Sequence, residues 1–407
     1  MVQVSRSLCI ALAIMSVVSL TNNRVYAGAF AVDEQGAAAM ARANAFSAQA
    51  NDPSALFYNP AGIGQLEGTQ VSLGTTLIAP TTTFESQVSG SVTDTEAAVF
   101  YPPTLYMTHE FSENIAGGLG VFVPFGLSTE WPGDWEGRYV TTFSEINTLY
   151  INPNIVWKST SGLHLAAGLT YVPSDVTLRS KVPPLPDSDM EIKADGDGWG
   201  YNLAVLATLP ARNSLGISFR SGVKVDYSGD TTISPSGLPD QIQSSLRFPP
   251  VLTVGIAHQL TDTLALEADW QWVGWSTVDK ITIDFAGQPA SNDSVTAKNW
   301  EDSSSLRLGV ERVFERAALR AGYAYDMTPI PDETIDPSLA DSDKQTFALG
   351  WGYRFSRASV DLAYMLIVSR DREVANTLQQ TDGTSFDHRG KYSTRMHELG
   401  LGFTYRF

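Results

Sequence analysis

Alternation between apolar and polar positions is the dominant pattern of this sequence. Near the C-terminus, one strand face carries only large apolar side chains: Leu399, Leu401, Phe403, Tyr405 and Phe407. The positions between them are polar or small. Because successive side chains of a β-strand point to opposite faces, this period of two predicts a strand with one apolar face. The stretches 346–355 and 359–368 repeat the pattern.

Fourteen such stretches follow one another along the chain. They span residues 69–84, 97–111, 114–127, 142–159, 162–180, 197–210, 213–229, 247–260, 263–285, 302–314, 317–326, 344–356, 358–370 and 393–407. Short turns, such as Ala211-Arg212, alternate with long loops, such as 128–141 and 327–343. This arrangement is typical of bacterial outer-membrane barrels. It predicts an all-β fold, a 14-stranded antiparallel transmembrane β-barrel with both ends of its wall at the periplasmic side.

A soluble β-sandwich or lectin-like protein is the alternative, since its sheets also alternate when one face is buried. Such a protein has no need for aromatic residues near the strand ends. Here they recur at Trp157, Trp199, Tyr227, Trp270, Trp272 and Trp351. Aromatic girdles at both interfaces suit a barrel in lipid, so the sequence favours the membrane barrel.

The first 27 residues have the pattern of a secretory signal peptide. Arg6 supplies the charge, Leu8 to Leu20 form the apolar region, and Val25-Tyr26-Ala27 is a small-residue cleavage box. We therefore expect a signal peptide at 1–27, an N-terminal hatch at 28–67 and the barrel at 68–407. The single cysteine, Cys9, lies inside the predicted signal, which excludes a disulfide scaffold and a thiolate metal site.

The net charge of −17 argues against nucleic-acid binding, since an acidic chain repels phosphates. After the predicted signal, no apolar run reaches 18 residues, which excludes a helical membrane protein. No cofactor is expected, and no phosphate-binding Gly-Lys-Ser/Thr loop supports an ATP-driven mechanism. Acidic residues gather at 326–343 without an EF-hand pattern, so solvated charge is favoured over a metal site.

Residues 28–67 do not alternate but are rich in Ala, Gly and Ser. Small residues allow close packing, and fourteen strands enclose a lumen too wide for side chains alone to fill. The segment is therefore predicted to form short helices that plug the lumen. It closes on Asn59-Pro60-Ala61. A purely local interpretation stands beside this one, since Asn is a good N-cap and Pro suits the first helical position.

The mature chain resembles the FadL-type long-chain fatty acid transporters of the outer membrane. The likeness runs through essentially all of it, in order, and is carried by the closing Asn59-Pro60-Ala61, the strand count and three phrases: PFGLSTEW (124–131), FRSGVKVDYSGD (219–230) and LRAGYAYDMTPIPDE (319–333). The resemblance implies a hatch in which Asn59-Pro60-Ala61 is a signature turn with a structural role. The family also includes transporters of monoaromatic hydrocarbons, so it implies a hydrophobic ligand without naming which one.

The resemblance further implies a kinked third strand that opens the wall sideways. In this sequence that strand contains Gly117, Gly118, Gly120, Pro124 and Gly126. Proline removes a ladder donor and glycine weakens a strand, so both gather at bends. A tapered strand without an opening is the plainer alternative.

Ligand contacts are predicted from strand parity and residue type. The candidate carboxylate-binding cations, placed in the lumen, are Arg220, Lys224, Arg307, Arg320 and Arg354. For each of them the alternative is pairing with a luminal acid. The candidate tail contacts are Phe30, Phe122 and Phe125, which otherwise pack hatch against wall. The candidate outer capture site is Trp131, Trp135 and Leu238, with interfacial anchoring as the alternative.

Four functions remain in play. The first is a passive, monomeric, outer-membrane transporter of long-chain fatty acids, in contact with membrane lipid and lipopolysaccharide. The second is the same barrel carrying aromatic or aliphatic hydrocarbons. A lipid hydrolase is disfavoured because none of the five histidines lies beside a nucleophile motif. A general porin is disfavoured because the predicted hatch fills the lumen.

Overall fold

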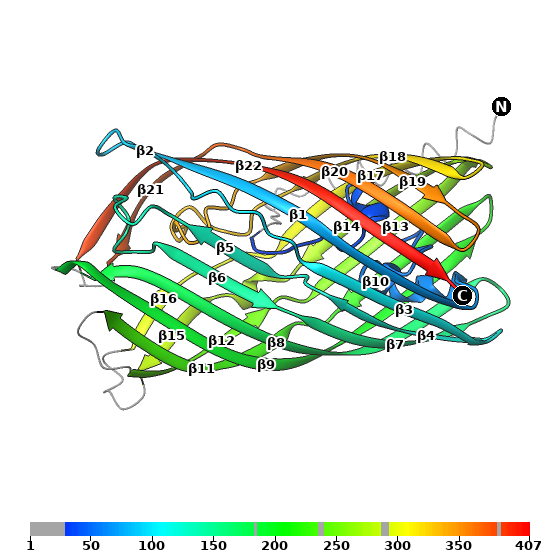
Figure 1. The fold of residues 1–407 in the computed structure, drawn as a ribbon, viewed down its shortest axis with the longest axis horizontal. Coiled ribbons are helices and arrows are strands. Elements are labelled where there is room, and N and C mark those ends of the chain that lie inside the picture. Colours follow the sequence, from blue (N-terminus) through cyan, green and yellow to red (C-terminus); the bar gives the residue numbers. More distant parts are fainter. Residues whose placement is uncertain (1–28, 183–184, 235–239, 286–292, 381–383) are drawn as a thin grey trace.

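The structure is a computed structural model, which describes residues 29–182, 185–234, 240–285, 293–380 and 384–407. The predicted signal peptide lies outside the described residues. The chain forms a closed 14-stranded antiparallel barrel, as the alternation predicted. The ring closes because β1 (Thr69–Ser86) pairs along its whole length with β22 (Ser385–Arg406), from Gln70 opposite Arg406 to Ser86 opposite Gly390 (Figure 1).

Some wall strands are continuous and others are divided into two segments. The continuous strands are β1, β3 (Pro103–Ser112), β8 (Leu163–Val182), β9 (Leu185–Leu209), β18 (Ala317–Asp326), β19 (Lys344–Arg354) and β22. The divided strands are β4 (Ile115–Phe122) with β5 (Gly126–Glu130), β6 (Phe143–Thr148) with β7 (Tyr150–Lys158), β10 (Asn213–Arg220) with β11 (Val223–Ser234), β12 (Asp240–Phe248) with β13 (Val251–Thr261), β14 (Leu264–Val273) with β15 (Lys280–Phe285), β16 (Ser294–Ala297) with β17 (Ser303–Phe314), and β20 (Ala358–Ser369) with β21 (Arg372–Gln379). A short β2 (Val92–Asp94) pairs with the end of β1, and the 3₁₀ helix η3 (Trp275–Thr277) follows β14.

The outward face is apolar where the sequence alternates. Leu399, Leu401 and Phe403 of β22 are each about two-fifths exposed, while Glu398 and Thr404 on either side of them face inward and are buried. Among the described residues, no helix is both long and apolar enough to cross a membrane.

The strands reach further toward the long-loop end than the pattern predicted. β9 begins at Leu185 rather than 197, and β22 begins at Ser385 rather than 393. A strand needs only about 9–11 residues to cross a bilayer, so these extensions project beyond it. Their outward positions are charged, as at Asp387 and Arg389, while inward residues such as Ile192 and Tyr392 are buried, so they lack the apolar lipid-facing side on which the prediction relied.

Residues 29–66, the N-terminal segment, lie inside the barrel. The segment contains α2 (Ala37–Met40), α3 (Ala55–Tyr58) and the 3₁₀ helix η2 (Pro60–Gln65), which pack against the wall from several sides (Figure 1). Inward glycines allow its backbone to touch the sheet. A Cβ atom at Gly216 would lie 2.0 Å from Ser47 O, and one at Gly322 would lie 2.1 Å from Arg42 C.

Two buried acids of β14 hold the middle of the N-terminal segment. Asp269 accepts hydrogen bonds from the backbone N–H groups of Phe46 and Ser47, both at 3.0 Å. Glu267 accepts one from Ala48 N at 2.6 Å and others from Gln49 N. These hydrogen bonds satisfy a turn of backbone that has no strand partner.

Candidate functional site

A cavity of about 630 Å³ lies inside the barrel, on the long-loop side of the N-terminal segment. This volume is within the range of small-molecule sites. Its apolar wall comes from several strands and includes Ile78, Leu127, Ile146, Met365, Ile367 and Met396. The N-terminal segment and loop 327–343 also contribute residues to its lining.

Charged side chains line the same cavity. Arg307 forms an ion pair with Asp33 at 2.6 Å, and Lys344 forms one with Asp341 at 2.8 Å. Glu34 and Glu398 also line the cavity. Asn44 donates a hydrogen bond to Glu34 Oε1 at 3.0 Å. Burial, with the neighbouring Asp33 carboxylate, raises the pKa of Glu34 to about 7.

The cavity reaches the wall at a break in the third strand, residues 123–125, between β4 and β5. The ladder between β3 and β4 ends at Leu105 opposite Val121, and β5 pairs with β6 alone among the named strands. Pro124 and Gly126 stand at this break. Gly117, Gly118 and Gly120 remain within the ladder of β4 with β3 and β7.

The N-terminal segment supplies the missing partners of the break. Val32 N donates to Pro124 O at 2.9 Å, and Gly126 N donates to Phe30 O at 3.0 Å. The Gln35 side chain donates from Nε2 to Val123 O and accepts from Val123 N. In lipid an unpaired backbone group is costly, so these contacts close the wall. The pattern of the sequence carried no signal for Gln35.

Arg220 differs from the other predicted cations. It is 8% exposed, and its guanidinium lies 5.0 Å from the Phe122 ring centre. Its side-chain hydrogen bonds, to Asn152 Oδ1 and Phe57 O, are both long at 3.4 Å. Within the described residues, no carboxylate lies at ion-pair distance from Arg220. It lines a small cavity of about 40 Å³, which also contacts Pro124 and Phe125.

The remaining cations are placed differently. Arg307 lines both cavities but is paired with Asp33, and Arg320 is bound by Glu311 and Asp361 at 2.6 Å each. Arg354 is exposed at the short-turn end and lines neither of these two cavities.

Of the five cations predicted to face the lumen, Lys224 is the one on the outward face of its strand. It is exposed and paired with Asp226, whereas its neighbours Val223 and Val225 face inward and are buried. The expectation of a luminal Lys224 is therefore corrected. Residues 221 and 222 lie between β10 and β11, and this irregularity shifts the inward face from even to odd positions.

The three predicted tail contacts are all buried phenylalanines. Phe30 lines the large cavity, 4.8 Å from the Trp275 ring centre, and Phe125 lines the small one. Phe122 lines neither of these cavities; it stacks between Tyr106 and Tyr150 beneath Arg220.

The predicted outer capture residues do not form an exposed surface. Trp131 and Trp135 stack at 4.6 Å, and each is at most 3% exposed. Trp131 lines the cavity and donates from Nε1 to Pro337 O at 3.0 Å. Leu238 lies outside the described residues. Trp131 contacts loop 327–343 through its bond to Pro337 O, and Trp135 packs against Trp131, Phe84 and Phe386.

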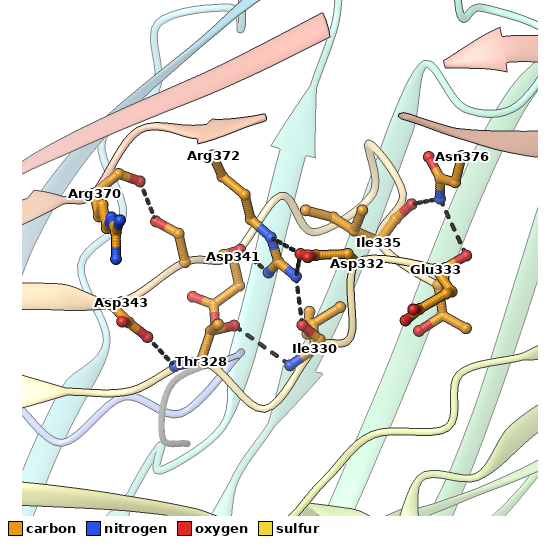
Figure 2. A network of polar contacts seen from close by, with 12 residues as sticks. Thr328, Ile330, Asp332, Glu333, Ile335, Asp341, Asp343, Arg370, Arg372 and Asn376 are labelled. Atoms are coloured by element: carbon orange, nitrogen blue, oxygen red, sulfur yellow. Dashed lines mark hydrogen bonds and ion pairs between the residues drawn. The ribbon is translucent and has the colours of Figure 1, made fainter. Parts of the chain in front are cut away.

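Figure 2 shows how this loop is held. Arg372 of β21 donates hydrogen bonds to Ile330 O, Asp341 O and Asp332 Oδ1. Asn376 donates to Glu333 O and Ile335 O. Lys298 also forms an ion pair with Asp336. Most acids of the stretch predicted as solvated charge therefore have hydrogen-bond or ion-pair partners. Asp341 also accepts a hydrogen bond from Ala29 N at 2.9 Å, which links the loop to the N-terminal segment.

Asn59 is fully buried and has both of the roles considered for it. Its Oδ1 accepts from Ala61 N at 3.1 Å, which caps η2 with Pro60 at the first position. Its Nδ2 donates to Ser47 O at 2.7 Å and to Val205 O of β9 at 3.0 Å. The side chain therefore joins a local cap to the barrel wall. None of Asn59, Pro60 and Ala61 lines either of the two cavities.

A closed barrel with an apolar belt, a plugged lumen and a partly apolar internal cavity is typical of an outer-membrane barrel for small hydrophobic molecules. The family described as "Outer membrane protein transport protein (OMPP1/FadL/TodX)" matches residues 18–407. The chain belongs to this family of outer-membrane transporters of hydrophobic compounds. No cluster of three or more His, Cys, Asp or Glu residues suited to a metal ion occurs in the part of the chain that the structure describes.

Individual relatives agree with this assignment. The long-chain fatty acid transport protein of Escherichia coli O6:H1 is 21% identical, over 85% of this chain and 88% of its own length. A solved FadL homologue of Pseudomonas aeruginosa superposes with a TM-score of 0.85 at 21% identity, covering 93% of this chain and 100% of its own. The Pseudomonas putida toluene transporter TodX superposes at 0.74 with 18% identity, covering 93% and 100%.

Proposed function

We propose that this protein is a passive transporter that takes up long-chain fatty acids through the outer membrane. The observation that carries the proposal is Arg220, a buried cation next to the cavities for which no described carboxylate is a partner. A guanidinium in a low-dielectric site binds a carboxylate strongly and in a defined geometry. The relative from Escherichia coli is named for long-chain fatty acid transport, which agrees with this ligand class.

The path proposed for the ligand follows the cavities. The fatty acid enters at the long-loop end past Trp131, and its tail occupies the large cavity against Phe30. The head group then reaches Arg220 beside Phe125 at the third-strand break. Displacement of the N-terminal segment from residues 123–126 opens the wall, so that the ligand leaves sideways into the membrane. No catalytic step is involved, and residues 28–67 act as a hatch positioned by Asn59-Pro60-Ala61.

The second candidate cargo is a monoaromatic or aliphatic hydrocarbon. The occupied arginines favour it, because Arg307 and Arg320 are already bound by carboxylates and offer little to a ligand head group. The toluene transporter TodX has the same fold. Fold alone does not separate the two cargoes.

Equilibrium binding tests the proposal. A labelled long-chain fatty acid is titrated into the detergent-purified mature barrel, with toluene and a long alkane as competitors. Saturable binding that other fatty acids displace, and that toluene and the alkane do not, is expected. Displacement by toluene, or no fatty acid binding at all, would assign the protein to hydrocarbons.

A further inference from the structure

The lining of the large cavity contains more acids than cations. The acids that line it are Asp33, Glu34, Glu145, Asp326, Asp341 and Glu398. Against them stand only two lining cations, Arg307 and Lys344. A ligand that enters this cavity therefore meets an excess of carboxyl groups beside an apolar surface.

Both lining cations are already engaged. Arg307 lies 2.6 Å from Asp33 and 4.0 Å from Asp326, and Lys344 lies 2.8 Å from Asp341. No cation of the described residues is within ion-pair distance of Glu34 or Glu398. Glu34 has the Asn44 amide as its neutral partner. Glu398 has no such neutral partner at its Oε2 atom among the described residues.

Glu398 is the buried acid whose partners are missing. It is 3% exposed, and its Oε2 makes no hydrogen bond to any described residue. In the sheet it stands opposite Ile78 of β1 and Met365 of β20, two apolar neighbours that also line the cavity. A buried polar group without a partner costs stability, so its retention on a cavity wall points to a ligand that completes it.

We propose that the large cavity also takes apolar compounds that carry a protonated amine, with the ammonium group bound by Glu398 and Glu34. The apolar part of such a compound lies against Ile78, Met365 and Met396. An organic cation fits better than a bare metal ion, because the space is about 630 Å³ and much of its lining is apolar. This inference rests on the proposed function, since it uses the same cavity and the same exit.

The large and the small cavity then select ligand head groups of opposite charge. Glu398 lines the large cavity and Arg220 lines the small one, and the two cavities share lining residues of the N-terminal segment, such as Ala31 and Asn44. A fatty acid places its head at Arg220, and a long-chain amine places its head at Glu398. Each ligand therefore depends on a different residue.

The experiment compares three compounds of equal chain length: dodecylamine, dodecanol and dodecanoate. Binding to the detergent-purified barrel is measured at pH 8, where a primary amine with a pKa near that of Lys, about 10.4, stays protonated. Dodecylamine is expected to bind about tenfold more tightly than dodecanol, the gain typical of a charge-assisted hydrogen bond. Glu398→Gln is expected to remove this difference while leaving dodecanol binding unchanged.

Two matched variants separate the possible outcomes. Glu145→Gln changes another lining acid and should keep the amine preference. Arg220→Gln should weaken dodecanoate and leave dodecylamine unchanged. Equal affinity of dodecylamine and dodecanol for the unaltered protein would overturn the inference without any variant. Dodecanoate binding without amine binding would overturn it and leave the fatty acid proposal standing, whereas binding of neither would reject both.

Discussion

The side-chain amide of Gln35 takes the place of a neighbouring strand for Val123. Its Nε2 donates to Val123 O at 2.8 Å, and Val123 N donates to its Oε1 at 3.1 Å. The two residues are 88 positions apart in the chain. One residue of the N-terminal segment thereby satisfies both backbone groups of Val123 at the break in the third strand of the barrel wall.

Replacing Gln35 should loosen the wall at this point. Gln35→Ala leaves both backbone groups of Val123 unpaired, which costs about 2 kcal/mol in the free energy of local opening. That corresponds to roughly 30-fold faster hydrogen exchange at residues 123–126. Gln65→Ala is the control, because Gln65 bonds only within the N-terminal segment. Unchanged exchange in Gln35→Ala would show that Val32 and Phe30 suffice to close the break.

Arg220→Gln should weaken fatty acid binding by about tenfold or more, since it replaces a charge-assisted contact by a neutral one. Arg354→Gln is the control, because Arg354 is exposed and lies outside both cavities described above. Arg320 was also a candidate, but its two ion pairs mean that its replacement should lower stability rather than affinity. Titration with a labelled fatty acid measures the effect. Equal affinities for unaltered protein and Arg220→Gln would remove Arg220 from the binding site.

Asn59→Ala should destabilise the N-terminal segment by about 2 kcal/mol, because it removes the cap of η2 and the bonds to Ser47 O and Val205 O. We expect the plug to loosen and ion conductance to rise above the low level of the unaltered protein in planar bilayers. Asn51→Ala, at an exposed position of the same segment, serves as the comparison. A high, steady current in the unaltered protein would instead indicate a general porin.

Arg372→Ala should release loop 327–343 from the mouth of the barrel. The substitution removes the hydrogen bonds to Ile330 O, Asp341 O and Asp332, so the loop keeps mainly the contacts from Asn376 and Lys298 (Figure 2). Limited proteolysis within 328–342 is expected to accelerate severalfold, with faster ligand entry. Arg389→Ala removes an exposed ion pair with Asp387 and should leave proteolysis unchanged. Equal cleavage in both variants would mean that Arg372 does not hold the loop.

Acid should loosen the long-loop end through His388. This residue lies in the part of β22 beyond the bilayer, bonded to Asn376 Oδ1 and Tyr392 OH. Burial lowers the pKa of His388 to about 4 from the usual 6.5. The unfolded region therefore binds the proton first, so stability is full above pH 6.5 and is lost as the pH falls toward 4. Hydrogen exchange of residues 372–378 measures this. His388→Gln should flatten the dependence between these two pH values, and an unchanged profile would assign it to other groups.

Strand count, antiparallel order and the outward apolar face could be predicted from the sequence, because each depends on a local period of two imposed by the membrane. Leu399, Leu401 and Phe403 need only lipid on one side to explain them. The composition of segment 28–67, which is rich in small residues, likewise predicted that this segment packs closely. Arg220 was found by the same parity, since no irregularity separates it from its strand neighbours in β10.

Tertiary structure alone decided the features that depend on which distant residues meet. The irregularity at residues 221 and 222 turned Lys224 outward, and Trp131 and Trp135 are buried against each other and against distant residues such as Pro337 and Phe84. Gln35 acquired its role from a strand break 88 residues away, and Lys344 pairs with Asp341, whereas Glu398 has no cation of the described residues at ion-pair distance. Alternation specifies the side of a sheet to which a residue points. It carries no information on what stands opposite, because that partner is set by the closure of the barrel around its plug.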